Sequence, residues 1–301
     1  MTTPKERFMG CLLGLACGDA VGTTVEFKPR GSFAPMTDMV GGGPFHLQAG
    51  QWTDDTSMAL CLGYSLVETG GFDAADQMNR YCRWYDDGYL SSTGRCFDIG
   101  NATSAALHRY KQSGDPFSGS TDPYSAGNGS IMRLAPVVMA FTPDEAQALH
   151  YAGESSKTTH AAPECVDACR LYGGMLHVAL QGGSKNDILG YRGCTPITPK
   201  IKAIADGGYR QKSLAQIKGS GYVVDSLEAA LWCFYTSDSY ETAVLQAVNL
   251  GDDADTTAAV CGQIAGAFYG RAAIPASWRE KVTMGAEIEK LALDLMGMGR
   301  G

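Results

Sequence analysis

An all-α fold is predicted by three features of this 301-residue sequence. Apolar residues recur at helical spacing through most of the chain. Strand signals are thin, because the clearest one, the Gly-Tyr-Val-Val run at 221–224, is too short to found a sheet. No interdomain linker or internal repeat is visible, so we expect one compact domain covering residues 1–301.

The composition is that of a folded protein with a modest acidic excess. Hydrophobic residues make up 45% and charged residues 19%, and 24 basic against 32 acidic residues give a net charge of −8. This balance argues against a nucleic-acid surface, which needs a basic face. The polar N-terminus is not a secretory signal, and no uninterrupted apolar run reaches the ~20 residues that cross a bilayer. We expect a cytoplasmic monomer without a membrane span.

The ten cysteines are scattered along the chain and include no Cys-x-x-Cys pair. Zinc is therefore not expected. Most of the cysteines stand singly inside apolar helical stripes, and we interpret them as small buried free thiols.

Glycines recur every four residues in two of the predicted helices. They are Gly10, Gly14 and Gly18 in the first helix, which starts at Pro4, and Gly262, Gly266 and Gly270 in the helix at 256–270. A stripe without side chains lets another helix come close, so we expect these two helices to pack at the centre of the domain. The first helix is expected to end near the Gly18–Gly22 segment.

Further helices are predicted by apolar spacing and by start signals. Thr142 and Pro143 are typical of an N-cap followed by a first helical residue, and an apolar helix follows residues 127–133. The others are expected at about 55–69, 73–87, 101–112, 162–181, 199–207, 225–236, 240–250, 256–270 and 278–296. Residues 29–51, rich in glycine and proline, are predicted to form a long functional loop.

Two acidic clusters each stand at the entry of an apolar helix. They are Trp52-Thr53-Asp54-Asp55-Thr56 and Gly251-Asp252-Asp253-Ala254-Asp255-Thr256-Thr257. Adjacent carboxylates repel, and burying an ionised one costs several kcal/mol unless it is neutralised. We therefore expect the clusters to meet around divalent metal. Their donors are all oxygens, which favours Mg²⁺, Mn²⁺ or Ca²⁺.

Helix capping is the alternative for these residues. Aspartate and threonine are ordinary N-caps worth ~1 kcal/mol each, and Asp252 fits such a role by itself. Two acid-rich helix entries in one chain, together with Glu26 after a Gly-Asp-Ala turn, favour the metal interpretation.

Three other polar motifs have a functional and a structural interpretation. The Gly127–Ser130 run is predicted to open a helix whose free N–H groups hold a phosphate, or else to be a simple turn. His160 either contacts an anion or caps the helix that follows. Asp98 is a functional acid or the N-cap of the helix near residue 101.

These motifs together resemble those of the ADP-ribosylglycohydrolase family, especially its bacterial branch of dinitrogenase reductase-activating glycohydrolases. The resemblance covers nearly the whole chain, and the motifs occur in family order. They are Gly18–Gly22 with Glu26, Thr53–Thr56, Asp98–Asn101, Gly127–Pro136, Thr159-His160, Gly221–Val224 and Gly251–Thr256.

The resemblance implies a compact domain of orthogonally packed helices with two Mg²⁺ or Mn²⁺ ions at the base of a cleft. The implied metal ligands are Thr53, Asp54 and Asp55 at one ion, Asp253 and Thr256 at the other, and Asp255 between them. The implied catalytic acid/base residues are Asp98 and Glu26, with the division of roles open. The implied substrate-binding residues are Gly100, Ser125, Asn128, Gly129, His160 and Tyr222, the last facing the adenine.

The implied reaction is hydrolysis of the glycosidic bond at C1″ of ADP-ribose attached to a protein, with ADP-ribose as product. Metals lower the pKa of a bound water, and a carboxylate moves a proton at the leaving group. The match at 98–101 points to arginine as the acceptor, and serine-linked ADP-ribose is the alternative. An isoprenoid-diphosphate enzyme is disfavoured, because its aspartates lie along helix interiors. A non-catalytic ADP-ribose-binding regulator would usually lack one of the acids, and the acid set here is complete.

Overall fold

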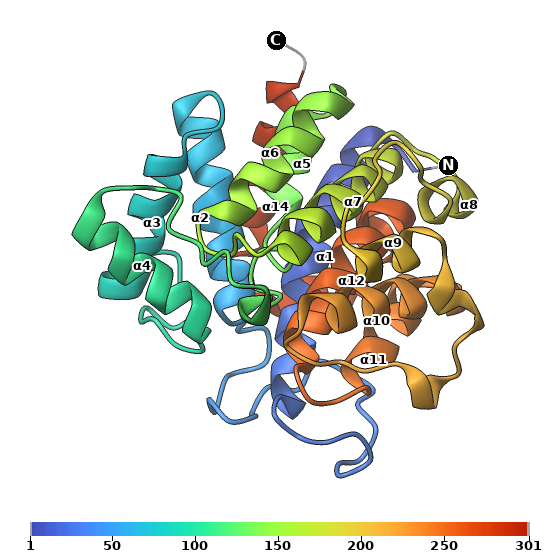
Figure 1. Ribbon diagram of the computed structural model, residues 1–301. Coiled ribbons are helices and arrows are strands. Elements are labelled where there is room, and N and C mark those ends of the chain that lie inside the picture. Colours follow the sequence, from blue (N-terminus) through green and yellow to red (C-terminus); the bar gives the residue numbers. More distant parts are fainter. Residues whose placement is uncertain (1, 300–301) are drawn as a thin grey trace.

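The computed structural model describes residues 2–299 as a bundle of α-helices joined by turns, short 3₁₀ segments and irregular loops (Figure 1). Between Thr2 and Gly299 the backbone forms isolated β-bridges but no strand, which confirms the all-α prediction. The helices are α1 (Pro4–Gly22), α2 (Asp54–Thr69), α3 (Ala74–Asp87), α4 (Asn101–Ser113), α5 (Ala135–Phe141), α6 (Glu145–Lys157), α7 (Pro163–Leu180), α8 (Lys185–Leu189), α9 (Pro199–Ala205), α10 (Val223–Thr236), α11 (Tyr240–Val248), α12 (Ala254–Tyr269), α13 (Ala276–Lys281) and α14 (Gly285–Met298).

The first helix ends at Gly22, within the segment 18–22 where its end was predicted. One predicted start is wrong: the helix expected to have Thr142 as its N-cap and Pro143 as its first residue starts at Glu145 instead. Asp144 is its N-cap and accepts a hydrogen bond from Gln147 N at 3.0 Å, while Thr142 ends α5.

The helix predicted at 278–296 is divided into α13 and α14. The break has a structural cause, because the backbone of Thr283 is bonded to the loop that precedes α2. Thr283 N donates to Gly50 O at 2.9 Å, and Trp52 Nε1 donates to Thr283 O at 3.0 Å. Met284 follows in a left-handed conformation with φ 58°, so the chain changes direction here.

Helices α1 and α12 cross at the centre of the molecule in backbone contact, as the glycine spacing predicted (Figure 1). A methyl group added at Gly14 would lie 2.4 Å from Gly262 O, and one at Gly262 would lie 2.1 Å from Gly14 O. Tyr240 Oη also donates to Gly14 O at 2.7 Å. Glycine is required at these positions because any β-carbon would overlap the opposite backbone.

The stretch Pro4–Val25, which contains α1, is long and apolar enough, by length and composition, to cross a membrane. However, 89% of its most apolar window is buried inside the protein. Its apolar surface is used by the core, which identifies it as a core helix. All ten cysteines are free, and most of them are buried as expected.

The central crossing brings three helix ends together. The last turn of α1 meets the first turn of α12, where a methyl group on Gly22 would lie 2.4 Å from Asp255 Cα. The segment between η1 (Thr23–Val25) and α2 is irregular, as predicted, and runs below α1 and α11 in Figure 1. This segment leads the chain back, so that α2 begins beside the contact between the last turn of α1 and the first turn of α12.

We expect Gly14→Ala to destabilise the protein by about 3 kcal/mol, the upper end of the cost of overpacking. The matched control is Gly297→Ala in α14, where an added methyl group has nothing within 4 Å and alanine is the better helix former. Urea unfolding followed by circular dichroism measures both variants. Equal stability of the two variants would contradict the proposed backbone contact.

Candidate metal centre and active site

The two acidic clusters meet, although about 200 residues separate them in the chain. Thr53 Oγ1 lies 3.2 Å from Asp255 Oδ2, and Thr256 Oγ1 donates to Asp55 Oδ1 at 3.1 Å. Asp54, Asp55 and Asp255 are all buried, between 0% and 7% exposed. The predicted meeting of the clusters is confirmed, and it takes place where the N-termini of α2 and α12 converge.

Capping does not account for these side chains. Thr53 and Asp253 occupy the N-cap positions of α2 and α12, yet neither side chain makes a capping hydrogen bond. Asp253 Oδ2 instead accepts from Asn128 Nδ2 at 2.9 Å. The N-cap of α4 is Gly100 rather than Asp98. The side-chain oxygens are therefore directed towards one another instead of towards their own helices.

Asp19 is part of the centre, and the sequence analysis assigned it no role. It lies in the last turn of α1 and is fully buried. Its carboxylate accepts from Thr53 N at 2.9 Å and Thr56 N at 3.0 Å, and also from both hydroxyls at 2.9 and 2.6 Å. Asp19 thus caps α2 from another helix. One feature of the sequence could have indicated its role: Asp19 is a single acidic residue near the end of an apolar helix with glycine at every fourth position.

The carboxylates form two groups that share Asp255. Oxygens of Asp19, Asp55 and Asp255 lie within 4.8 Å of one another, and so do oxygens of Glu26, Asp98 and Asp255. Burial first, and then repulsion between neighbouring acids, raises the pKa of Asp54, Asp55 and Asp255 well above its usual range. Burial likewise raises the pKa of Glu26 to about 10 and that of Asp98 to about 7.

This donor set fits a hard divalent cation. Within residues 2–299, Asp55 Oδ2 and Glu26 Oε2 are buried without a hydrogen-bond partner. An unpartnered buried oxygen is costly, and an ionised one more so. The donors are carboxylate and hydroxyl oxygens, which Mg²⁺ and Mn²⁺ prefer. A cation among them removes both the repulsion and the missing partners.

Glu26 and Asp98 are held at the edge of the centre by unusual backbone. Phe27 N donates to Asp252 O at 2.7 Å, and Asp252 N donates to Lys28 O at 2.9 Å, which ties the Glu26 segment to the entry of α12. Phe27, Asp98 and Asp252 all have left-handed φ values, of 62°, 62° and 58°. Strained backbone of this kind is concentrated at functional sites.

A cleft of about 410 Å³ opens over the centre. Asp54, Asp253, Asp255 and Thr256 line it together with Glu26 and Asp98, whereas Thr53 and Asp55 are buried beneath it. Residues 100–103, the first turn of α4, line one wall, and no side chain caps this helix. Its free N–H groups and positive dipole end suit an anion such as a diphosphate.

The Gly127–Ser130 run does not open a helix, and of its two interpretations the structure supports the turn. These residues form turns, and α5 begins only at Ala135. Asn128 and Gly129 nevertheless line the cleft. Asn128 N is bonded to Gly221 O at 3.0 Å, which joins this turn to the segment before α10. The helix N-terminus on the cleft belongs to α4.

His160 lies against this turn as a neutral ring. Burial and the nearby Arg133 charge lower the pKa of His160 to about 3. Thr159 Oγ1 accepts from Arg133 at 2.7 Å and lies 2.8 Å from His160 Nδ1. When the Thr159 hydroxyl donates to Nδ1, the ring proton is on Nε2, which lies close to Gly127 and Gly129. In this tautomer the neutral His160 ring can donate a hydrogen bond at the cleft, which it lines.

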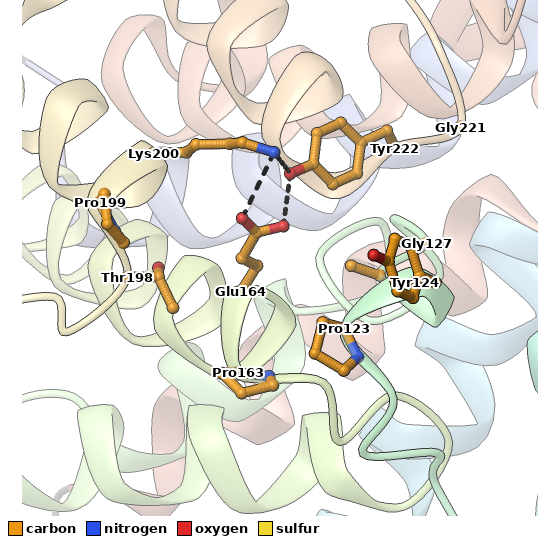
Figure 2. Close-up of a pocket in the computed structure, with 11 residues that line it drawn as sticks. Pro123, Tyr124, Gly127, Pro163, Glu164, Thr198, Pro199, Lys200, Gly221 and Tyr222 are labelled. Carbon is orange, nitrogen blue, oxygen red and sulfur yellow. Dashed lines mark hydrogen bonds and ion pairs between the residues drawn. The ribbon is translucent and has the colours of Figure 1, made fainter.

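A larger pocket of about 710 Å³ adjoins the cleft and shares Gly127 and Gly221 with it. Figure 2 shows Glu164 bonded to both Lys200 and Tyr222 on one wall, with Pro123 and Tyr124 on the other. Lys200 Nζ donates to Tyr222 Oη at 2.7 Å, which fixes the Tyr222 ring. The structure does not place Ser125 in either cavity, because its hydroxyl donates to Asp122 O at 2.7 Å.

The helical fold presents clustered buried carboxylates at the foot of a cleft, an arrangement that suits a hydrolase. The ADP-ribosylglycohydrolase family profile matches residues 1–301, and the chain belongs to this family of glycosyl hydrolases, as the sequence motifs indicated.

Several named relatives are similar over nearly the whole chain. ADP-ribosylarginine hydrolase Tri1 of Pseudomonas putida (strain GB-1) is 49% identical, over 97% of this chain and 79% of the relative. The ADP-ribosyl-[dinitrogen reductase] glycohydrolase of Rhodospirillum rubrum is 35% identical, over 96% and 95%. A solved structure described as an ADP-ribosylglycohydrolase-related protein complex has a TM-score of 0.88 and 42% identity, covering 98% of this chain and 99% of that one.

We expect Asp55→Asn to stabilise the metal-free protein above neutral pH. The raised carboxyl pKa values mean that the wild-type protein loses stability as pH rises through them. Mg²⁺ or Mn²⁺ should raise the wild-type melting temperature, since an ion at 100 times its Kd adds ~2.7 kcal/mol. Asp55→Asn should lose most of that gain.

The control is Asp252→Asn, which changes the exposed acid of the other acidic cluster and should keep the metal response. Scanning calorimetry at pH 6 and pH 8, with and without metal, measures all three proteins. A wild-type melting temperature that does not respond to metal would contradict a cation site here.

Proposed function

We propose that this protein removes ADP-ribose from arginine side chains of modified proteins by hydrolysing the N-glycosidic bond at C1″. The observation that carries the proposal is the meeting of two acidic helix entries beneath a cleft that has Glu26 and Asp98 at its edge. Relatives named ADP-ribosylarginine hydrolase, 49% and 43% identical over 97% of this chain, support arginine as the acceptor.

Two Mg²⁺ or Mn²⁺ ions complete the proposed site. Thr53, Asp54 and Asp55 would hold one ion, Asp253 and Thr256 the other, with Asp255 between them. When bound, such ions orient the ribose hydroxyls and lower the pKa of a water molecule. The placement of Asp19 supports this arrangement, because its bonds to Thr53 and Thr56 hold the first turn of α2 in position.

Glu26 and Asp98 are the proposed acid/base residues. Their carboxyl oxygens lie within 4.8 Å of Asp255 and of each other, and both residues line the cleft but not the larger pocket. In hydrolysis the C1″–N bond breaks and a C1″–O bond to water forms. One carboxylate takes the proton of the water, and the other carboxyl supplies a proton to the leaving nitrogen.

The rest of the substrate extends along the two joined cavities. The α4 N-terminus at Gly100, the turn at Asn128 and Gly129, and the His160 Nε2 proton are the proposed partners of the ribose and diphosphate. The Tyr222 ring is proposed to face the adenine in the 710 Å³ pocket. We treat residues 1–301 as one monomeric cytoplasmic unit, with an ADP-ribosylated protein as substrate and ADP-ribose as product.

The proposal predicts release of ADP-ribose from an ADP-ribosyl-arginine peptide in the presence of Mg²⁺ or Mn²⁺. A matched ADP-ribosyl-serine peptide should be cleaved far more slowly, and a chelator should abolish turnover of both. Chromatographic measurement of free ADP-ribose tests each combination. Faster cleavage of the serine peptide would contradict the assignment of the acceptor.

Asp98→Asn should lower turnover of the arginine peptide by a factor of about 10²–10⁴, the usual contribution of a positioned acid or base. Asparagine tolerates the left-handed backbone at this position, so binding of ADP-ribose should remain. Turnover assays and calorimetry with ADP-ribose measure the two effects, with Asp252→Asn as control. Normal turnover in Asp98→Asn would disprove its catalytic role.

A further inference from the structure

Phe27 stands at the mouth of the cleft with 65% of its surface exposed. It directly follows Glu26 and has a left-handed backbone with φ 62°. A bulky residue is rarely found in this conformation, because it is sterically unfavourable. The hydrogen bond that holds it runs from Phe27 N to Asp252 O, which most side chains would permit. Folding therefore does not explain an exposed aromatic ring at this point.

Phe27 belongs to a row of three rings, Phe27, Phe45 and Phe97, which we call the aromatic rim. The ring centroids of Phe27 and Phe45 are 6.3 Å apart at 74°, and those of Phe45 and Phe97 are 5.2 Å apart. Phe97 directly precedes Asp98. The rim thus joins the chain neighbours of both proposed acid/base residues, and it comes from two loops, the segment between η1 and α2 (Phe27 and Phe45) and the segment between α3 and α4 (Phe97).

The cavities indicate which part of the substrate meets this rim. Glu26, Phe27 and Asp98 line the 410 Å³ cleft but not the 710 Å³ pocket, which joins the cleft at Gly127 and Gly221. If the adenosine end lies in the larger pocket and C1″ lies near Glu26 and Asp98, the bond that breaks points away from the adenosine. The leaving group then passes out along the aromatic rim.

The charges of the cleft favour a cation as leaving group. Five carboxylates line it, and no lysine or arginine is among the lining residues that the structure describes. His160 is neutral in its buried place. Two bound divalent ions would offset four of those charges and leave an acidic edge beside the rim. A planar guanidinium is attracted both by carboxylates and by the face of an aromatic ring.

We propose that Phe27, supported by Phe45 and Phe97, is a specificity-determining residue that stacks against the guanidinium of the acceptor arginine. This inference rests on the proposed function and extends it to the acceptor side of the substrate. Phe27 selects a flat cationic leaving group, while the metal centre and the larger pocket recognise the ADP-ribose.

The test uses Phe27→Leu, which keeps an apolar side chain without an aromatic face, and Phe27→Tyr, which keeps the face. For the ADP-ribosyl-arginine peptide, Phe27→Leu should lower kcat/KM about three- to thirty-fold, mainly through KM. Phe27→Tyr should restore it. The Kd for free ADP-ribose, which has no acceptor, should be unchanged in both variants. The control is Phe117→Leu, another exposed phenylalanine that borders a separate hollow.

Three results would overturn the inference. Wild-type kinetics in Phe27→Leu would remove Phe27 from acceptor recognition and leave the proposed function intact. An equal loss of affinity for free ADP-ribose would place Phe27 at the sugar site instead. Failure of the wild-type protein to cleave the arginine peptide, with ADP-ribose still bound, would refute the proposed function itself, and the inference with it.

Discussion

Repulsion among buried carboxylates is the constraint on which this structure depends. The ends of α1, α2 and α12 converge at one point, and each of them contributes acids there. The crossing of α1 and α12 allows no adjustment, because Gly14 and Gly262 are in backbone contact. The charges are therefore held together by the apolar core around them. A divalent cation bound among these carboxylates would offset their repulsion and would be a partner for the oxygens that the protein leaves without hydrogen bonds.

The cleft above this centre is lined by two chemically different sets of groups. The α4 N-terminus, the Asn128 turn and the neutral His160 offer polar groups without side-chain charge. Glu26, Asp98 and the exposed ring of Phe27 offer carboxyl groups and an aromatic face. The first set suits an anionic diphosphate and the second suits a cationic acceptor, and ADP-ribosyl-arginine carries both.

Local sequence signals located the helices and the acids and predicted that the two acidic helix entries meet, but they did not reveal the hydrogen bonds that position these residues. Capping was the alternative for Thr53 and Asp253, and the partners of their side chains in other segments exclude it. Asp19 was missed because its four hydrogen bonds all go to another helix. The break before α14 was missed for the same reason, since it depends on bonds from Thr283 to the distant loop before α2.

The sequence by itself determined the all-α class, the close central helix pair and the two acidic helix entries. Each of these follows from residue spacing or from chemistry that acts over one or two turns. The tertiary structure alone decided that α4 rather than the Gly127 turn presents a helix N-terminus to the cleft, and that Ser125 faces away from it. It also decided that Phe27 stands exposed beside the acids. These features depend on contacts between loops far apart in the chain, which no local pattern records.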